Sequence, residues 1–167
     1  VRSVVGSSLA AAEAYHEEHR RDLDTDTQAL ANYINLSRQA AFLLSDAELR
    51  QILTQGQTQI QRGLREAYVI DGTGDVKARG ERSYLFDFEK PTDDELKRAK
   101  SGETVMIEDW DNNEFRALEA LTAFPDRYLY VSRNVDGKIL NLLDDTRATV
   151  GLYQQLEATR GRVIFEF

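Results

Sequence analysis

The first thirty-five residues carry apolar positions at helical spacing. Apolar or partly apolar side chains recur along one side of a helix, at Val5, Leu9, Ala12, Leu23, Leu30 and Tyr33. No proline interrupts them, so we predict one helix over residues 1–35, roughly 50 Å long. A compact domain of this size does not need so long a helix. The pattern therefore predicts a stalk, followed by a break near residues 35–37.

A second helix is predicted after a short apolar segment at residues 39–44. Ser45 and Glu48 form a capping box, in which the serine hydroxyl accepts from a backbone N–H and the glutamate reaches back. Leu49 and Leu53 then begin an amphipathic face that extends towards Gly63.

From Glu66 the apolar period changes from helical to two, which is typical of strands. Residues 67–71 and 76–80 are rich in β-branched and aromatic side chains and are separated by a glycine-containing turn. They are predicted to form a β-hairpin. Residues 83–88 are expected either to extend the sheet or to cross over it.

Three further strands and two helices complete the predicted fold. A short helix begins at a second capping box, Thr92 and Glu95, and a long one covers residues 135–162. The strand-like runs between them lie at residues 104–110, 114–124 and 127–133. The fold class is α+β: a five-stranded antiparallel sheet with a long N-terminal helix, a short helix between strands and a long C-terminal helix. We expect the helices to gather on one side of the sheet.

Charge and composition restrict the function. The chain has 167 residues, 41% of them apolar and 30% charged, which is ordinary for a globular domain. Its net charge of −8 argues against a nucleic-acid partner, whose phosphates attract basic surfaces. Because cysteine is absent, a thiol nucleophile and a thiolate metal site are excluded.

Several motifs resemble those of one family. Residues 69–74 together with 78–80 resemble a hairpin of extracytoplasmic PAS-like sensor domains. The motifs at residues 8–19, 130–136 and 152–157 are similar to the periplasmic region of the NtrY family of nitrogen-regulation sensor kinases. The similarity extends over essentially the whole chain.

The resemblance implies an organisation of the chain. Residues 1–167 would form a single periplasmic sensor domain: a stalk helix at 1–35, a PAS/Cache-like core at 36–134 and a signalling helix at 135–162. It also implies that the chain is excised from a bacterial inner-membrane protein, with transmembrane helices just before and just after it.

The resemblance also implies partners. Two copies are expected to pair through their long helices as a homodimer. The full-length protein would be an ATP-dependent histidine protein kinase that acts on a cognate response regulator. This chain would contain no catalytic residue and no cofactor of its own.

His16 and His19 are the candidates for a metal site. They lie three residues apart on one helical face, with Glu13 and Glu17 nearby, so they could bind a divalent ion or titrate near neutral pH. The alternative is that they are packing or surface positions of the helix. No third strong ligand lies close in sequence, so a metal site would require a second chain.

The candidate ligand-binding residues are aromatic side chains and one arginine on predicted strands: Tyr68, Trp110, Arg116, Tyr128 and Tyr130. Such a set suits a small anion or an amino acid, because a guanidinium grips a carboxylate through two hydrogen bonds. The alternative is that Tyr128 and Tyr130 share a core face while Arg116 is solvated on the other.

We therefore interpret the chain as the sensing domain of a two-component histidine kinase, passing a periplasmic stimulus through flanking membrane helices. The alternative is a ligand-free dimerisation or scaffold module that is read by a partner protein or by the state of the membrane. Neither interpretation identifies the stimulus.

Overall fold

The computed structural model describes residues 2–40, 45–60, 64–81, 83 and 88–139. Residues 20–135 form one compact unit, and the described residues outside that range belong to a second. The second unit contains the first half of the long helix and residues 136–139. Each unit is described by itself.

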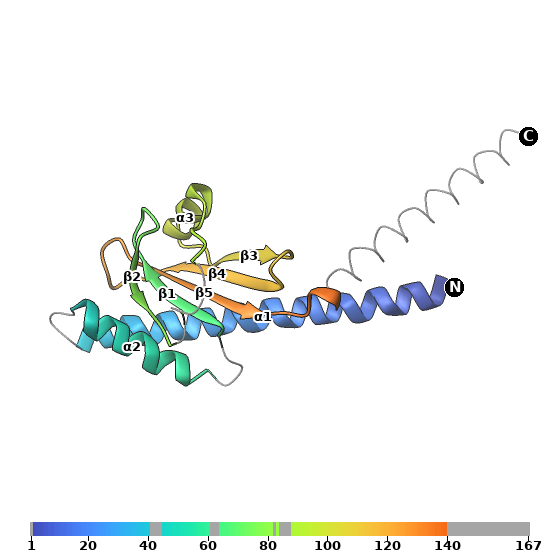
Figure 1. Ribbon diagram of the computed structural model, residues 1–167, viewed down its shortest axis with the longest axis horizontal. Helices are drawn as coiled ribbons and strands as arrows, with labels where there is room; N and C mark the ends of the chain where they lie inside the picture. Colours follow the sequence, from blue (N-terminus) through green and yellow to red (C-terminus); the bar gives the residue numbers. More distant parts are fainter. Residues whose placement is uncertain (1, 41–44, 61–63, 82, 84–87, 140–167) are drawn as a thin grey trace, which may run out of the picture. The chain divides into compact units, whose positions relative to one another are not determined.

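Five strands form one antiparallel sheet in the order β2-β1-β5-β4-β3. Their bounds are β1 Glu66–Ile70, β2 Val76–Arg79, β3 Val105–Asp109, β4 Glu114–Ala120 and β5 Tyr128–Asn134. The helices are α1 Arg2–Ala40, α2 Asp46–Thr58 and α3 Asp93–Lys100, as Figure 1 shows. The predicted α+β class, with a long N-terminal helix and a five-stranded antiparallel sheet, is confirmed.

Helix α1 continues five residues beyond its predicted end. The break expected near residues 35–37 is wrong, because the polar side chains there do not compete with the helix. The Ser37 hydroxyl donates to the Tyr33 carbonyl within the helix at 2.9 Å. The Asn35 side-chain oxygen accepts from the backbone N–H of Ala123 at 3.1 Å. Asn35 and Ser37, which the sequence indicated as helix breakers, therefore stabilise this end of α1.

Both predicted capping residues lie where helices begin, but at Ser45 the Glu48 carboxylate accepts from the serine hydroxyl and does not complete the predicted box. The backbone N–H of Glu48 donates to the Ser45 hydroxyl at 3.2 Å at the start of α2. At the start of α3, Thr92 and Glu95 exchange both bonds of the box. The long C-terminal helix predicted over residues 135–162, and most of the segment at 83–88, fall outside the described residues.

Three of the predicted strands are shorter than expected, and β2 is one of them, because it ends at Arg79. Strand β3 ends at Asp109, so Trp110 lies in the turn to β4 and not on a strand. Strand β4 ends at Ala120, because the backbone N–H of Leu121 donates to the Arg127 carbonyl and closes the connection to β5.

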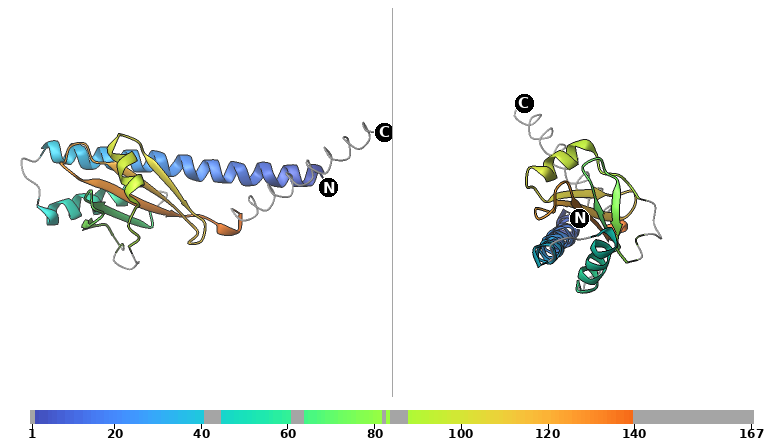
Figure 2. Two further views of the ribbon diagram at one scale, coloured as in Figure 1. Left: turned by 90° about the horizontal axis from the view of Figure 1, so that it is seen from above. Right: turned by 90° about the vertical axis from the view of Figure 1, so that its left-hand side faces the viewer.

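The helices cover both faces of the sheet, not one. Figure 2 shows α3 on the side of the sheet opposite to α1 and α2. Towards α3, Leu96 and Ala99 pack in an apolar cluster with strand residues that include Ile70 and Tyr128. Strand β1 is buried along its whole length, because the sheet is covered on both sides. Its last four residues, 67–70, are therefore all apolar or aromatic and do not alternate with polar residues.

Candidate functional site

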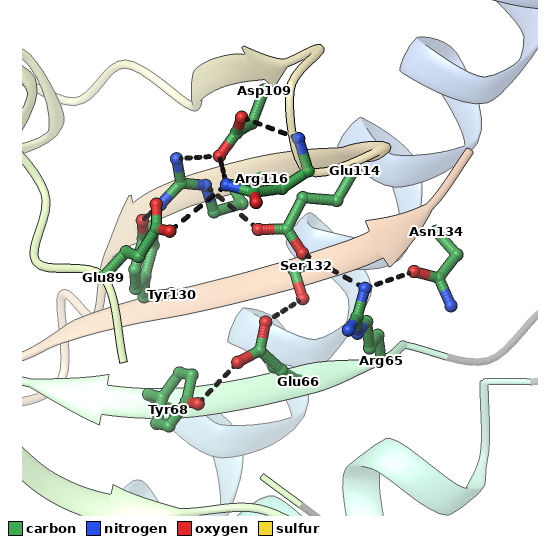
Figure 3. A network of polar contacts seen from close by, with 11 residues as sticks. Arg65, Glu66, Tyr68, Glu89, Asp109, Glu114, Arg116, Tyr130, Ser132 and Asn134 are labelled. Carbon is green, nitrogen blue, oxygen red and sulfur yellow. Dashed lines mark hydrogen bonds and ion pairs between the residues drawn. The ribbon is translucent and has the colours of Figure 1, made fainter. Parts of the chain in front are cut away.

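Polar side chains gather at one end of the α3-facing side of the sheet. Residues that are paired across strands share a face, and the register pairs Glu66 with Ser132, and Ser132 with Arg116. The same face carries Glu114, two positions before Arg116, and Asp109 opposite it on β3. We call the following set the charged cluster: Arg65, Glu66, Tyr68, Glu89, Asp109, Glu114, Arg116, Tyr130 and Ser132 (Figure 3).

Arg116 is the centre of this charged cluster. Its guanidinium donates to Asp109 Oδ2 at 2.8 Å and to the Tyr130 hydroxyl at 2.7 Å. Glu89, from the loop that precedes α3, lies 3.2 Å from the same group. Only 13% of the Arg116 side chain is exposed, so these contacts offset the cost of burying its charge, but its Nε has no hydrogen-bond partner among the described residues. Its pKa is raised by the nearby Tyr130 hydroxyl and the surrounding carboxylates, against the effect of burial.

Glu66 is buried and hydrogen-bonded through both carboxylate oxygens. Oε1 accepts from the Tyr68 hydroxyl at 2.7 Å, and Oε2 accepts from the Ser132 hydroxyl at 2.8 Å. Burial, followed by the hydrogen bond to Glu66, raises the pKa of Tyr68 far above its usual range. Burial does the same for Tyr130. Both phenols are therefore neutral at physiological pH.

Glu114 is a buried carboxylate that lies between two guanidinium groups. Its side chain is 8% exposed, and its oxygens lie 3.6 Å from Arg116 Nε and 3.8 Å from Arg65 Nη1. Burial and the neighbouring Glu66 carboxylate raise the pKa of Glu114 above its ordinary value. In Figure 3, the side chains of Glu114, Ser132 and Glu66 follow one another across β4, β5 and β1.

A cavity of about 10 Å³ opens within the charged cluster. That is the room of one water-sized group, so it does not hold an amino acid or a dicarboxylate. An anion that binds to both terminal nitrogens of Arg116 would also have to displace Tyr130 and Asp109. The lining residues are Glu66, Tyr68, Glu89, Glu114, Arg116, Tyr130, Val131 and Ser132.

Three of the five predicted ligand residues meet in the charged cluster: Tyr68, Arg116 and Tyr130. Tyr128 lies on the same face but packs in the apolar cluster beside α3, and Trp110 lies outside the cavity lining. The interpretation that Arg116 is solvated on the opposite face from Tyr130 is wrong, because the two side chains are hydrogen-bonded. Whether these residues bind a ligand stays a prediction.

The acidic members of the charged cluster were not predicted. Glu66 and Ser132 stand two positions from the tyrosines, and Glu114 two positions before Arg116. That period-two spacing put them on the face of the selected residues and was the available signal. This signal was missed because a single charged residue near the end of a strand is equally compatible with a solvent-exposed position.

The two histidines lie on α1, in the second unit. The rings of Tyr15 and His19 are 4.2 Å apart, and both His16 and His19 are partly exposed. Among the residues that the structure describes, no three His, Cys, Asp or Glu side chains are grouped to hold a metal ion. The metal site at His16 and His19 stays a prediction.

A larger groove lies between α2 and the edge strand β2. It has a volume of about 760 Å³ and is open, and its lining includes Asp46 and Glu81 as well as Arg50 and Lys77. Its lining holds side chains of both charges, so it presents no convergent set of groups for one ligand. The charged cluster is the better candidate site.

The fold and the charged cluster define an α+β domain of the PAS-like architecture, with one sheet face packed on long helices and the other partly polar. The chain belongs to the family described as the NtrY N-terminal region, whose model matches residues 1–165. In the described part of the chain, no helix is both long and apolar enough to cross a bilayer.

Three curated relatives illustrate the similarity. A putative sensor histidine kinase, NtrY-like, from Rickettsia felis is 29% identical over 160 residues, which cover 94% of this chain and 26% of the relative. Its counterpart in Rickettsia bellii is 28% identical over 167 residues, covering 98% and 26%. The nitrogen regulation protein NtrY of Azorhizobium caulinodans is 28% identical over 160 residues, covering 95% and 20%. The chain therefore spans between a fifth and about a quarter of the length of these relatives.

Proposed function

We propose that this chain is the periplasmic sensing domain of a membrane-bound sensor histidine kinase. The observation that carries the proposal is the family match over residues 1–165, together with relatives that are named sensor histidine kinases. The chain aligns with only a fraction of those relatives. The catalytic domains and the response-regulator partner would accordingly belong to the rest of a longer protein.

The position of β5 supports a signalling role. It is the middle strand of the sheet, and it carries Tyr130 and Ser132 of the charged cluster on one face. Arg133 is on the other face, with Nη1 3.7 Å from Asp26 Oδ2 of α1. A change at the charged cluster would therefore reach α1 through a single strand. Helix displacements of about 1–2 Å are the usual scale of such signals.

A second link lies in the other unit. The Tyr15 hydroxyl of α1 accepts a hydrogen bond of 2.7 Å from the backbone N–H of Asp136, just after β5. This bond joins the long helix to the segment that we propose continues as the signalling helix. In the proposed mechanism, a stimulus alters this junction, and the flanking membrane helices of each subunit in a homodimer transmit the change.

The test of this coupling removes the Tyr15 hydroxyl, which accepts the hydrogen bond, and keeps the aromatic ring. Tyr15→Phe is introduced into the full-length kinase in lipid nanodiscs, and autophosphorylation is measured. The matched control is Tyr33→Phe in the same helix. We expect Tyr15→Phe to shift the phosphorylation level about fivefold or more, and the control to leave it unchanged. Equal rates for wild type and Tyr15→Phe would contradict the coupling.

The periplasmic location has its own test. An alkaline-phosphatase fusion that is inactive at residue 100 would contradict the periplasmic location.

One observation favours the alternative, a dimerisation module without a ligand. Two nitrogens of the Arg116 guanidinium already donate to Asp109 and Tyr130, and the cavity beside this group has room for only one water-sized group, so no amino acid or dicarboxylate fits there. Thermal-shift measurements with amino acids, carboxylates, nitrate and divalent metals distinguish the two. A saturable rise in Tm supports a directly binding ligand, and flat curves with every compound support the module.

A further inference from the structure

Two consecutive side chains of the loop that precedes α3, Phe88 and Glu89, contact the aromatic rings and the guanidinium of the charged cluster. The Phe88 ring lies edge-on to the rings of Tyr68 and Tyr130, with centroids 5.0 and 5.9 Å away. Those two tyrosines are paired neighbours on β1 and β5, with ring centroids 6.4 Å apart. The loop therefore places an apolar group over an aromatic pair, as the body of a small ligand would.

The Glu89 carboxylate lies on two donors. Its Oε2 is 3.2 Å from Arg116 Nη1, and its Oε1 accepts from Asn112 Nδ2 at 3.2 Å. In Figure 3, Glu89 reaches Arg116 from the loop, whereas Asp109 and Tyr130 reach it from strands. The Glu89 side chain is 52% exposed and that of Asp109 is 13% exposed. Because solvent screens the Glu89 contact, Glu89 is easier to replace than Asp109.

Charge determines what could replace Glu89. Arg116 also faces the carboxylates of Asp109 and Glu114, at 2.8 and 3.6 Å, so an additional anion would add negative charge beside one guanidinium. A ligand carboxylate that replaces Glu89 leaves the balance unchanged, because one carboxylate is exchanged for another. A cation does not fit this place, since Arg116 and Asn112 both present N–H donors there.

The loop also accounts for the small size of the cavity. With Glu89 as part of its lining, the cavity has a volume of about 10 Å³. Phe88 packs against the apolar cluster that includes Tyr68 and Tyr130. Withdrawal of the two loop side chains would free room for a phenyl-sized group over the tyrosine rings and for a carboxylate beside Arg116. The chain itself therefore closes this part of the sheet.

We propose that Phe88 and Glu89 form an intramolecular plug, which occupies the place of a small carboxylate ligand with an apolar or aromatic body. Such a ligand binds by displacing the plug. Its carboxylate takes the donors of Arg116 and Asn112, and its body replaces the Phe88 ring. The inference deepens the proposed sensing function, on which its role in signalling rests, by naming a ligand class and an autoinhibitory contact.

The experiment titrates this chain with 3-phenylpropionate at constant ionic strength and follows the fluorescence of Trp110, its only tryptophan. Trp110 comes directly after Asp109, which accepts from Arg116, so a change at the guanidinium alters the surroundings of the indole. We expect weak, saturable binding by wild type, because the ligand competes with the plug. 3-Phenylpropionamide has the same body without the charge and should bind at least about tenfold more weakly.

Two variants release the plug, and a third is the matched control. Phe88→Ala removes the competing ring and should tighten the binding of 3-phenylpropionate about tenfold or more, whereas loss of a ring that only stabilises the fold would not favour a ligand. Glu89→Gln keeps the shape, removes the charge and should tighten binding about threefold. It decides the question if Phe88→Ala does not fold. Phe124→Ala truncates another partly buried ring, in the β4–β5 connection, and should leave the affinity unchanged.

Four results would overturn the proposal. They are an affinity that is the same in wild type and both plug variants, an equal gain in Phe124→Ala, equal binding of the acid and the amide, and an absence of saturable binding in every variant. These measurements read binding to this chain only. They can therefore fail while the phosphorylation test of Tyr15→Phe succeeds, and the reverse also holds.

Discussion

Asp26 of α1 and Arg133 of β5 face each other across the packed side of the sheet, with Oδ2 and Nη1 3.7 Å apart. Their side chains are 8% and 12% exposed. Burying two charges costs solvation free energy that their attraction offsets only in part, so the pair is weak evidence for stability. It does fix where α1 sits against the middle strand.

Removing the guanidinium should therefore destabilise this contact. We expect Arg133→Gln to lower the free energy of unfolding by about 2–3 kcal/mol, because Asp26 stays buried while its facing cation is lost. Urea denaturation measures the change. Arg98→Gln on the exposed surface of α3 changes the same charge and should cost clearly less stability, because solvent screens its ion pair with Glu103. Equal effects of the two variants would show that the Asp26–Arg133 contact is unimportant.

The close approach of α1 and α2 depends on Gly56. A Cβ at this position would lie 2.5 Å from Leu30 Cδ1 and 2.9 Å from Tyr33 Cδ1. Alanine is better than glycine inside a helix by up to about 1 kcal/mol, but overpacking costs about 1–3 kcal/mol. We expect Gly56→Ala to be less stable than wild type in urea. Gln55→Ala, one exposed position earlier, should show only the favourable helix effect.

Acid should weaken the β1–β2 turn through Asp71. Its Oδ1 accepts from the Thr73 hydroxyl at 2.6 Å, from the Thr73 N–H at 2.9 Å and from the Asp75 N–H at 3.0 Å. The hydrogen bond from the Thr73 hydroxyl is the main cause that lowers the Asp71 pKa from 3.8 to about 2. A lowered folded-state pKa means stability that is present above about pH 4 and lost as the pH falls towards 2.

The test of Asp71 is a comparison of melting temperatures. Wild type should exceed Asp71→Asn at pH 6, and the difference should shrink between pH 4 and pH 2. Asp75→Asn serves as the control, since the Asp75 side chain accepts none of these bonds. A difference that stays constant with pH would assign the effect of Asp71→Asn to geometry and not to charge.

Glu114 should produce the opposite dependence on pH. Its pKa is raised above 4.5 in the folded chain, chiefly by burial. Between 4.5 and the raised value, the folded state binds more protons than the unfolded state, so stability falls as the pH rises. In sodium buffer, Glu114→Gln should gain stability relative to wild type from pH 4.5 upwards. Glu103→Gln is the control, because Arg98 lowers the pKa of Glu103. The stability difference between this variant and wild type should change with pH in the opposite direction or not at all.

Local signals predicted most of the fold. Capping boxes at Ser45 and Thr92 located two helix starts, and the residues of the Asp71 turn located the hairpin. The failures arose where a distant partner decides. The sequence indicates a helix break at Asn35, but the Asn35 side chain instead accepts a hydrogen bond from Ala123. The apolar run after Ala120 indicates a longer strand, but a backbone hydrogen bond to Arg127 closes a turn there.

The candidate site was half visible for the same reason. Aromatic residues and an arginine on strands drew attention to Tyr68, Arg116 and Tyr130. The carboxylates became part of the site only through the order β1-β5-β4, which places Glu66 and Glu114 on either side of Ser132. Sequence spacing within one strand cannot reveal the neighbour that lies two strands away.

The alternation of side chains along β5 links the two faces of the sheet. Tyr130 and Ser132 project to one side of this strand, and Arg133 projects to the other, towards Asp26. Because both sets of side chains belong to one backbone, a tilt of β5 would move them together and in opposite directions. In the proposed mechanism, a change on the polar side would therefore reach the long helix through this one strand.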